Sequence, residues 1–334
     1  MKILVRAPNW IGDSILAIPA IRSLHENFPE DQMYIAARGW VKDLFSSFDF
    51  IKGVIPLPDN VNLKNLRQSA NSLKEEGFQV GLLLTNSFSS ALLFFMAGIP
   101  QRWGYASDGR RILLTKGVRP MKHQFSYFHH VHYYLDLISR LGYKTSPPEL
   151  SLPLSQTQEQ EAASFLTSLG IDFTRPLVIL NPGAYYGPAK RWPISRFARL
   201  AEMLQERNNA EILIIGSYEE AGLAKEIATL MKKRPYILAG KTSLPLLAGI
   251  IHKANLFITN DTGPMHIANA LKTPLIALFG PTNPHVTGPF QEPSAVIKKD
   301  VPCWPCLYRE CPFDHRCMTS IESEEVYLAC QKFL

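Results

Sequence analysis

One stretch decides the fold of this chain: NLFITNDTGPMH, at residues 255–266. Its apolar start, residues 255–259, predicts a buried strand, and the apolar run at residues 267–271 predicts a helix packed on that strand. The polar turn between them brings unpaired backbone N–H groups and the positive end of a helix to one point. Such a point suits a phosphate group.

The residues of this turn fit that interpretation. Asp261 or Thr262 can cap the helix, Gly263 lets a ligand approach the backbone, and Pro264 occupies a first-turn position where no N–H is needed. His266 falls one turn later, near the face that Thr262 occupies. An ordinary capped helix with a hydrogen-bonded histidine explains this segment equally well, so a phosphate site needs a second, independent feature.

A second loop supplies cationic side chains. The run LVIL at residues 177–180 predicts a strand, NPGA at residues 181–184 ends it, and an amphipathic helix begins after Pro193. Lys190 and Arg191 therefore lie at the carboxyl end of a strand, where open α/β sheets bind ligands. Alone, they would be solvated loop residues. Two such loops in one half of the chain predict a single anionic, phosphorylated ligand.

Strands and helices alternate along both halves of the 334-residue chain. This alternation predicts two Rossmann-like α/β domains with parallel sheets, at residues 1–155 and 156–320, and a C-terminal helix at residues 321–334. The expected strands are 2–7, 33–37, 52–57, 79–84, 177–181, 211–216, 235–239, 255–259 and 274–279. The expected helices of the first half are 14–27, 39–47, 62–76 and 88–98.

Several sequence blocks, in this order, resemble the ADP-heptose:lipopolysaccharide heptosyltransferases, glycosyltransferase family 9. The first block, VRAPNWIGDS at residues 5–14, looks like the heptosyltransferase II branch of that family. The other blocks are Asn181-Pro182-Gly183-Ala184 with Lys190-x-Trp192-Pro193, Gly216-Ser217, LAGKTSL at 238–244, Asn260-Asp261-Thr262-Gly263-x-x-His266 and Phe279-Gly280-Pro281-Thr282. They run from the first strand to beyond residue 280, so the resemblance covers most of the chain.

The resemblance implies a GT-B architecture, in which two Rossmann-like domains face each other across a cleft and the C-terminal helix packs back on the first domain. It implies an inverting transfer of heptose from ADP-heptose to the heptosyl-Kdo2-lipid A inner core of lipopolysaccharide, with no cofactor required. Two absences agree with this. The first βα turn has no Gly-x-Gly-x-x-Gly, which disfavours a nicotinamide dehydrogenase, and the chain has no Asp-x-Asp to hold a divalent ion on a nucleotide diphosphate.

Two residues are the candidates for catalysis. Glycosyl transfer needs stabilisation of the leaving diphosphate and a base for the acceptor hydroxyl. The resemblance assigns Lys190 to the diphosphate, aided by the amides of Thr262 and Gly263. Asp13, just after the first strand, is the candidate base, and the resemblance favours this role over that of a plain helix cap.

The remaining donor-binding candidates follow strands of the second domain. Glu219 or Glu220 is expected to accept from the ribose hydroxyls, and the sequence leaves the choice open. Lys241, Thr242 and Ser243 are expected to border the adenine, mostly through backbone groups. Asp261 is expected to orient Lys190, cap the helix or hold sugar hydroxyls, and His266 is a candidate phosphate donor.

The acceptor is expected to meet cationic residues of the first domain. Residues 101–150 contain eight Lys and Arg against three Asp and Glu, a balance of +5, which attracts phosphates, acidic sugars or anionic lipid heads. No nucleic-acid-binding module is recognisable, so nucleic acid is not expected as a partner. The acceptor candidates are Lys64, Arg67, Arg102, Arg110 and Arg111, although solvated surface charge explains any one of them.

The chain is expected to work in the cytoplasm, peripherally at the inner face of the cytoplasmic membrane. Met1 is followed at once by a first strand, with no secretory pattern. The stretch from Gly77 to Gln101 carries no charge, but polar residues 85–90 split it into a short strand and a helix, which disfavours a membrane span. Part of that helix is expected near the membrane surface.

Four cysteines cluster near the C-terminus: Cys303, Cys306, Cys311 and Cys317, with His315 among them. A cytoplasmic protein keeps such thiols reduced, which favours metal binding or free thiols over disulfides. The spacing is compact and holds only one Cys-x2-Cys pair, so a structural zinc ion and simple free thiols both remain open.

Two alternatives to the heptosyl transfer are distinguishable. A related GT-B transferase for another nucleotide sugar or acceptor would keep Lys190 and Asp261 and change the pocket. A non-catalytic nucleotide-binding protein with a zinc knuckle would bind ADP tightly without consuming a donor. A glycosidase is disfavoured because no two carboxylates can be placed on either side of one bond.

Overall fold

The computed structural model describes residues 1–60, 62–120 and 128–334. The chain divides into two compact units, Met1–Pro153 and Leu154–Leu334. Each unit contains one six-stranded parallel sheet, so the prediction of two α/β domains with parallel sheets is confirmed. Lys122, which contributes to the basic balance of residues 101–150, lies outside the described residues.

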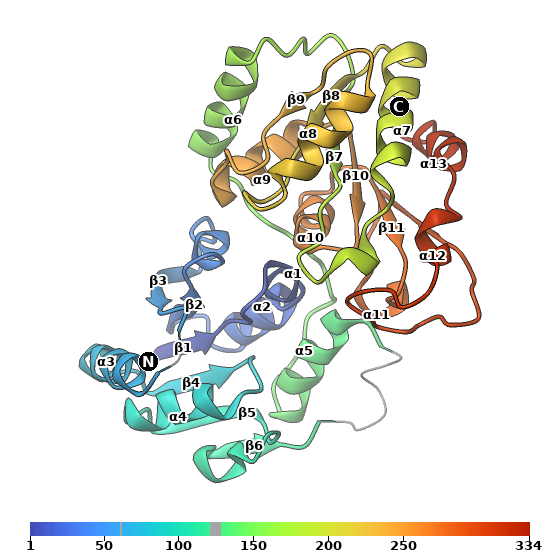
Figure 1. Ribbon diagram of the computed structural model, residues 1–334. Coiled ribbons are helices and arrows are strands. Elements are labelled where there is room, and N and C mark those ends of the chain that lie inside the picture. Colours follow the sequence, from blue (N-terminus) through green and yellow to red (C-terminus); the bar gives the residue numbers. More distant parts are fainter. Residues whose placement is uncertain (61, 121–127) are drawn as a thin grey trace. The chain divides into compact units, whose positions relative to one another are not determined.

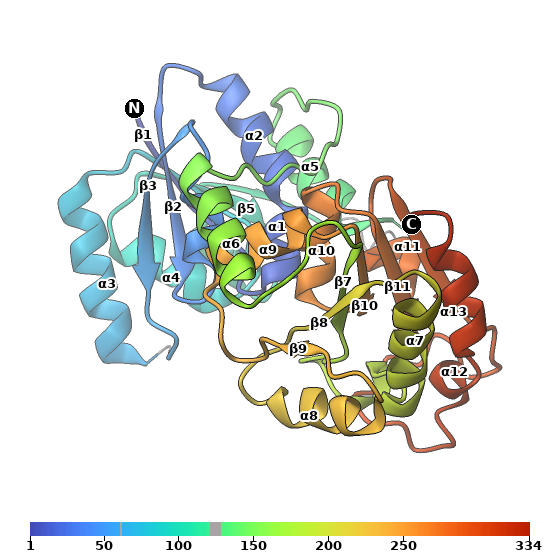
Figure 2. The same ribbon diagram turned by 90° about the horizontal axis from the view of Figure 1, so that it is seen from above.

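The first unit has the sheet order β3-β2-β1-β4-β5-β6 (Figure 1). Its strands are β1 (Lys2–Arg6), β2 (Gln32–Arg38), β3 (Ile51–Leu57), β4 (Val80–Leu83), β5 (Gln101–Tyr105) and β6 (Lys116–Val118). Its helices are α1 (Ile11–Leu16), α2 (Ile18–Asn27), α3 (Leu63–Glu76), α4 (Phe88–Met96) and α5 (His130–Arg140), with 3-10 turns η1 (Lys42–Phe45) and η2 (Arg110–Leu113). Helices α2 and α5 cover one face of the sheet and α3 and α4 the other (Figure 2).

The second unit repeats this topology, with the sheet order β12-β11-β10-β7-β8-β9. Its strands are β7 (Leu177–Asn181), β8 (Glu211–Ile214), β9 (Tyr236–Ile237), β10 (Leu256–Asn260), β11 (Leu275–Phe279) and β12 (Ser294–Lys298). Its helices are α6 (Gln156–Ser168), α7 (Ile194–Arg207), α8 (Ala221–Leu230), α9 (Leu244–Lys253), α10 (Gly263–Ala270), α11 (Pro284–Thr287), α12 (Arg316–Thr319) and α13 (Ser323–Cys330), with the 3-10 turn η3 (Pro188–Lys190).

The apolar runs of the central strands explain why the sheets are parallel and covered on both faces. Every residue of β4, β7, β10 and β11 is buried, as expected for strands with helices on either side. Trp192 anchors the core of the second unit: its indole N–H donates to the carbonyl of Ile321 at 2.9 Å, and its ring meets that of Phe197 edge-on. Burying a side chain of this size contributes on the order of 2–3 kcal/mol.

Each sheet has one point where the strand order reverses direction. In the first unit it lies between β1 and β4, and in the second between β7 and β10. Loops at the carboxyl ends of the two strands diverge there and leave a crevice, which is where open α/β sheets bind ligands. The two units therefore have topologically equivalent reversal points.

Some elements differ from the sequence-based expectation. The helix expected at 14–27 is two helices joined at Ala17, because Pro19 has no N–H donor and starts a new first turn. The helix expected at 39–47 is wrong: only η1 forms, since Ser46, Ser47 and Asp49 favour turns. Strands β5, β6 and β12 were not predicted, because each contains a lysine or arginine and lacks a continuous apolar run.

The C-terminal segment packs within the second unit. Helix α13 lies against α7, and the Ser323 hydroxyl donates to the carbonyl of Arg196 at 3.0 Å. Its expected contact with the first domain stays a prediction. In the described part of the chain, none of the helices combines the length and the apolar character needed to span a bilayer.

Candidate functional site

Two loops meet at the reversal point of the second sheet, as their positions in the sequence predict. They are tied together by asparagines: Asn181 donates to the Thr259 hydroxyl at 3.0 Å, and Asn260 donates to the carbonyls of Pro182 and Gly183 at 2.8 and 3.2 Å. The Asn260 side chain also accepts from the backbone N–H of Trp192 at 3.1 Å. The loop after β7 is thus fixed to the loop after β10, and Lys190 of the first lies against Asp261 of the second.

Lys190 and Asp261 form an ion pair at this point. The side chains are 12% and 5% exposed, so both charges are largely removed from water. The Thr282 hydroxyl donates to the same carboxylate oxygen of Asp261 at 2.6 Å, and the Lys190 ammonium lies 4.8 Å from the ring centre of Tyr186. These contacts hold the ammonium group in one orientation.

Helix α10 begins directly beside this pair. Thr262 occupies the N-cap position, as the sequence predicts, with extended backbone, but its side chain makes no capping hydrogen bond. The Asp261 carboxylate turns to Lys190 and Thr282, so of the roles expected for Asp261 it is the orientation of Lys190 that the contacts support. The positive end of α10 lies next to Lys190. His266 is buried one turn further along.

The two glutamates after β8 differ in their surroundings. The Glu220 carboxylate accepts from the backbone N–H of Ser217 at 2.9 Å and lies against Gly183, where an added Cβ would approach within 2.3 Å of all three carboxyl atoms. Glu219 is exposed, and hydrogen bonds from its own backbone N–H and from Ser217 lower the pKa of its carboxyl. Only Glu220 faces the loop that carries Lys190.

The loop after β9 contains the three residues expected near an adenine. Lys241 is exposed and its ammonium donates to the carbonyl of Ile237 at 3.0 Å. Ser243 is the N-cap of α9 and accepts from the N–H of Leu246. The side chains of Lys241 and Ser243 are thus engaged with the fold, and Thr242 between them is half-buried.

Asp13 lies in the first unit, in the first turn of α1. The N-cap residue of this helix is Trp10, so Asp13 is not the cap. Its carboxylate is one-third exposed, and one oxygen lies 3.7 Å from Nδ1 of His130, the first residue of α5. The carboxylate therefore has a nearby imidazole and access to solvent, both of which suit a proton acceptor.

The predicted acceptor residues are not gathered in one place. Lys64 and Arg67 are exposed on α3, and Arg111 is exposed on η2. Arg102 is half-buried and donates to the carbonyl of Leu113 at 2.7 Å. Arg110 is fully buried, with its guanidinium donating to the carbonyls of Thr85 and Tyr105, and burial lowers its pKa to about 10. Arg110 therefore stabilises the loop that surrounds it, and we do not carry it into the proposed site.

The cysteine segment, residues 303–317, contacts the loop that carries Lys190. Cys303, Cys306, Cys311 and Cys317 line one cavity of about 210 Å3. In residues 1–60, 62–120 and 128–334, no three His, Cys, Asp or Glu side chains are positioned to hold a metal ion. The segment contacts the loop through its backbone: the Arg309 carbonyl accepts from the N–H of Ala189 at 3.0 Å, and Nε2 of His315 lies 2.8 Å from the Ala189 carbonyl.

Sequence reasoning missed three polar residues of this site. Thr282, Asn181 and Asn260 appeared only as parts of motifs, with no role of their own, yet Thr282 bonds to Asp261 and the two asparagines tie the surrounding loops together. A signal was present, since each lies at or just after the end of a buried strand of the same sheet. The sequence did not indicate which of these strand ends are neighbours.

The comparisons with known proteins agree with this geometry. The model of glycosyltransferase family 9 (heptosyltransferase) matches residues 66–316. Lipopolysaccharide heptosyltransferase 2 of Escherichia coli K12 is 32% identical over 89% of this chain and 88% of its own length. Lipooligosaccharide heptosyltransferase 2 of Campylobacter jejuni (strain 81116) is 31% identical over 98% of this chain and 97% of its own.

Solved structures of this family have the same fold as this chain. The structure of E. coli ADP-heptose LPS heptosyltransferase II superposes with a TM-score of 0.86 at 28% identity, over 100% of this chain and 98% of that one. A family 9 protein of Veillonella parvula has a TM-score of 0.87 at 23% identity, which shows the shared fold. The predicted GT-B fold is thereby confirmed. The chain belongs to glycosyltransferase family 9, the heptosyltransferases.

Proposed function

We propose that this chain is an inverting heptosyltransferase. It transfers heptose from ADP-heptose to the heptosyl-Kdo2-lipid A inner core of lipopolysaccharide. The observation that carries the proposal is the Lys190–Asp261 pair beside the N-terminus of α10, at the reversal point of the second sheet. Relatives named as heptosyltransferase 2, about a third identical over most of the chain, support this donor and acceptor class.

In this proposal each domain binds one of the two substrates. Residues 156–320 bind the nucleotide sugar, and residues 1–155 bind the acceptor. The acceptor hydroxyl oxygen attacks the anomeric carbon of the heptose while the bond from that carbon to the β-phosphate oxygen breaks. The hydroxyl proton passes to Asp13, and the electron pair of the broken bond leaves with ADP. A single displacement of this kind inverts the anomeric centre.

Lys190 stabilises the charge that develops on the leaving diphosphate, together with the N–H groups of Thr262 and Gly263. Asp261 acts by positioning: its carboxylate, fixed by Thr282, holds the ammonium in place. A carboxylate this close to phosphates is tolerable because the lysine lies beside it and carries the opposite charge. His266, buried one turn into α10, is the further donor candidate on the same helix.

The test is ADP release from ADP-heptose by the full-length protein, with and without heptosyl-Kdo2-lipid A. We expect release only when acceptor is present, together with a product heavier by one heptose in mass spectrometry. Tight ADP binding with no donor consumption, under any acceptor of this class, would contradict the proposed transfer.

Of the two glutamates, we propose Glu220 as the acceptor of the ribose hydroxyls. Its carboxylate faces the Lys190 loop at Gly183, whereas that of Glu219 is exposed. Glu220→Gln is expected to raise KM for ADP-heptose by about 10- to 100-fold, the range for a hydrogen bond to a charged group. Glu219→Gln is the matched control and should leave KM within about twofold of wild type. Equal effects of the two substitutions would contradict the assignment.

We also propose that the protein works peripherally at the inner face of the cytoplasmic membrane. Three large apolar side chains are exposed on α4 and on η2, which packs against it: Phe88, Phe95 and Ile112. Arg102 lies 5.3 Å from the ring centre of Phe95, and Arg111 is exposed beside Ile112. Apolar side chains flanked by arginines favour binding to anionic bilayers. Co-sedimentation with anionic but not zwitterionic vesicles is the expected result.

The cysteine cavity is proposed as a structural zinc site, outside the catalytic steps. Four thiols line it, and the segment is hydrogen-bonded to the Lys190 loop at Ala189. The side chains as they stand are not spaced for a metal, so binding requires their rotation. Elemental analysis of protein purified under reducing conditions should give about one zinc per chain, lost in Cys317→Ser. If the purified protein contains no metal and is fully active, the zinc proposal is wrong and the four cysteines are free thiols.

A further inference from the structure

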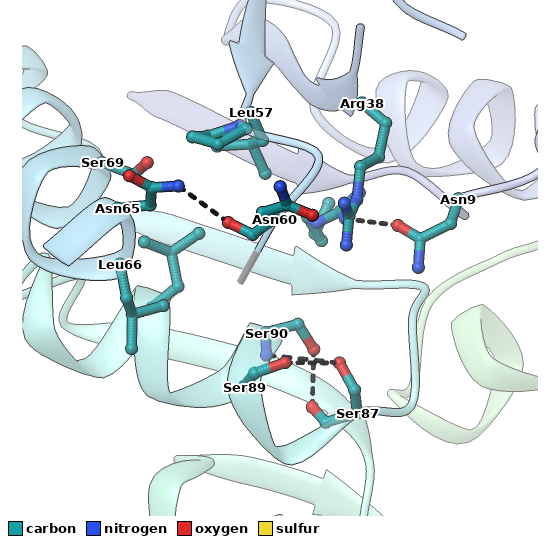
Figure 3. Close-up of a pocket in the computed structure, with 13 residues that line it drawn as sticks. Asn9, Arg38, Leu57, Asn60, Asn65, Leu66, Ser69, Ser87, Ser89 and Ser90 are labelled. Atoms are coloured by element: carbon teal, nitrogen blue, oxygen red, sulfur yellow. Dashed lines mark hydrogen bonds between the residues drawn. The ribbon is translucent and has the colours of Figure 1, made fainter. Parts of the chain in front are cut away.

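The first domain has its own polar pocket at the reversal point of its sheet. The pocket lies where β1 ends at Arg6 and where β2 ends at Arg38, beside the start of α4, which follows β4 (Figure 3). This is the position equivalent to that of the Lys190–Asp261 pair in the second domain, since both sheets have the same strand order. None of the predicted acceptor residues lines it.

Arg6 places a buried positive charge in this pocket. The residue is 5% exposed, and its guanidinium donates to the carbonyls of Ala7 and Ala36 and to the side chain of Asn9 at 2.6 Å. All of these acceptors are neutral. Burial and repulsion by Arg38 lower the pKa of Arg6 to about 10, and no described carboxylate offsets the two effects. A buried charge without an opposite charge is unfavourable, which points to an anion from outside the chain.

Arg38 brings a second guanidinium to the same wall. It is half-buried, and its guanidinium carbon lies 5.6 Å from the ring centre of Trp40. The Trp40 indole N–H donates to the carbonyl of Asn9 at 2.6 Å, so the stacking partner of Arg38 is itself fixed to the pocket loop. The two arginines repel each other, and a shared anion would stabilise both.

The other walls are polar and neutral. Ser87, Ser89 and Ser90 lie at the start of the nine-residue helix α4, opposite Arg38 and Asn9 in Figure 3, where the Ser87 hydroxyl caps the helix by accepting from the Ser90 N–H. Asn60, Asn65 and Ser69 line a third side, and no acidic residue lines the described pocket. An anion in this pocket would therefore meet two guanidinium groups and no opposing negative charge. The cavity of about 50 Å3 exceeds the roughly 10–15 Å3 that one water molecule needs, so it fits one small group.

We propose that the pocket lined by Arg6 and Arg38 binds one anionic group, a phosphate or carboxylate, of the acceptor saccharide. The inference rests on the proposed heptosyl transfer for the identity of the acceptor. Arg38 is then a specificity-determining residue: it selects acceptors that carry negative charge beside the attacking sugar. Arg6 forms part of the pocket wall and keeps its hydrogen bonds to the carbonyls of Ala7 and Ala36.

The first test is kinetic and uses Arg38→Gln, since Arg38 is only half-buried and its loss leaves the core intact. KM for the acceptor is expected to rise about 10- to 100-fold, the effect of losing a charge-assisted hydrogen bond, with KM for ADP-heptose unchanged. Arg38→Lys should recover part of the loss. Lys52→Gln removes the same charge from an exposed position of β3 outside the pocket and should match wild type. An unchanged acceptor KM in Arg38→Gln would overturn the proposal.

The second test does not depend on transfer. Full-length protein saturated with ADP is titrated with inorganic phosphate and, separately, with free Kdo, and binding is followed by tryptophan fluorescence, with Trp40 beside Arg38 as a reporter. Saturable binding that is lost in Arg38→Gln and kept in Lys52→Gln supports an anion site, even if the transfer reaction itself is not observed. Absence of binding in wild type, or binding unaffected by Arg38→Gln, would overturn the anion site.

Discussion

Asp13→Asn is expected to reduce acceptor-dependent ADP release by about 10²- to 10⁴-fold, the contribution of a well-placed general base. The substitution keeps the shape of the side chain and removes its ability to take the acceptor proton. Asp13 is not the cap of α1, so the helix should not be weakened by loss of a capping group. The measurement is the steady-state rate at saturating ADP-heptose and acceptor.

Two controls make this result specific. ADP affinity, measured by calorimetry, should be unchanged in Asp13→Asn, because Asp13 belongs to the first unit and the diphosphate site to the second. Asp49→Asn makes the same chemical change at an exposed position of the first unit and should keep full activity. Full turnover in Asp13→Asn, with normal ADP binding, would remove Asp13 from the mechanism.

Lys190→Ala is expected to lower both activity and stability. Loss of the diphosphate cation should reduce kcat/KM by about 10²- to 10³-fold. The same change leaves the Asp261 carboxylate, 5% exposed, without its cation, and breaking a buried pair costs about 3–5 kcal/mol in the free energy of unfolding. Activity assays and chemical denaturation measure the two effects separately.

A double variant separates the two roles of Lys190. Lys190→Ala with Asp261→Asn removes both charges, and Thr282 can still donate to the asparagine oxygen. Stability should recover in large part while activity stays low, because the carboxylate is no longer stranded and the diphosphate still lacks its cation. Recovery of activity together with stability would show that Lys190 only supports the fold.

Many of the strands and helices could be predicted from local sequence patterns. The runs at 177–181 and 255–259 are buried strands β7 and β10 within one residue of the expected bounds, because a continuous apolar run bounded by polar turns has few other stable placements. The turn at 260–264 likewise starts a helix, since Gly263 and Pro264 suit a first turn. Strands β5 and β6, which each contain a charged side chain, have no such continuous apolar run and were missed.

The sequence by itself determined the two α/β domains, the family, and the loops that carry Lys190, Asp261 and Asp13, since each follows from residues adjacent in the chain. Tertiary structure alone decided which side chains meet. It placed the carboxylate of Asp261 on Lys190 rather than on α10, turned Glu220 rather than Glu219 toward the neighbouring loop, and buried Arg110. It also joined Arg6 and Arg38 in one pocket. The physical reason is the strand order: β1 lies beside β2 and β4, and β7 beside β8 and β10, so residues up to about eighty positions apart become neighbours through pairings that no local pattern specifies.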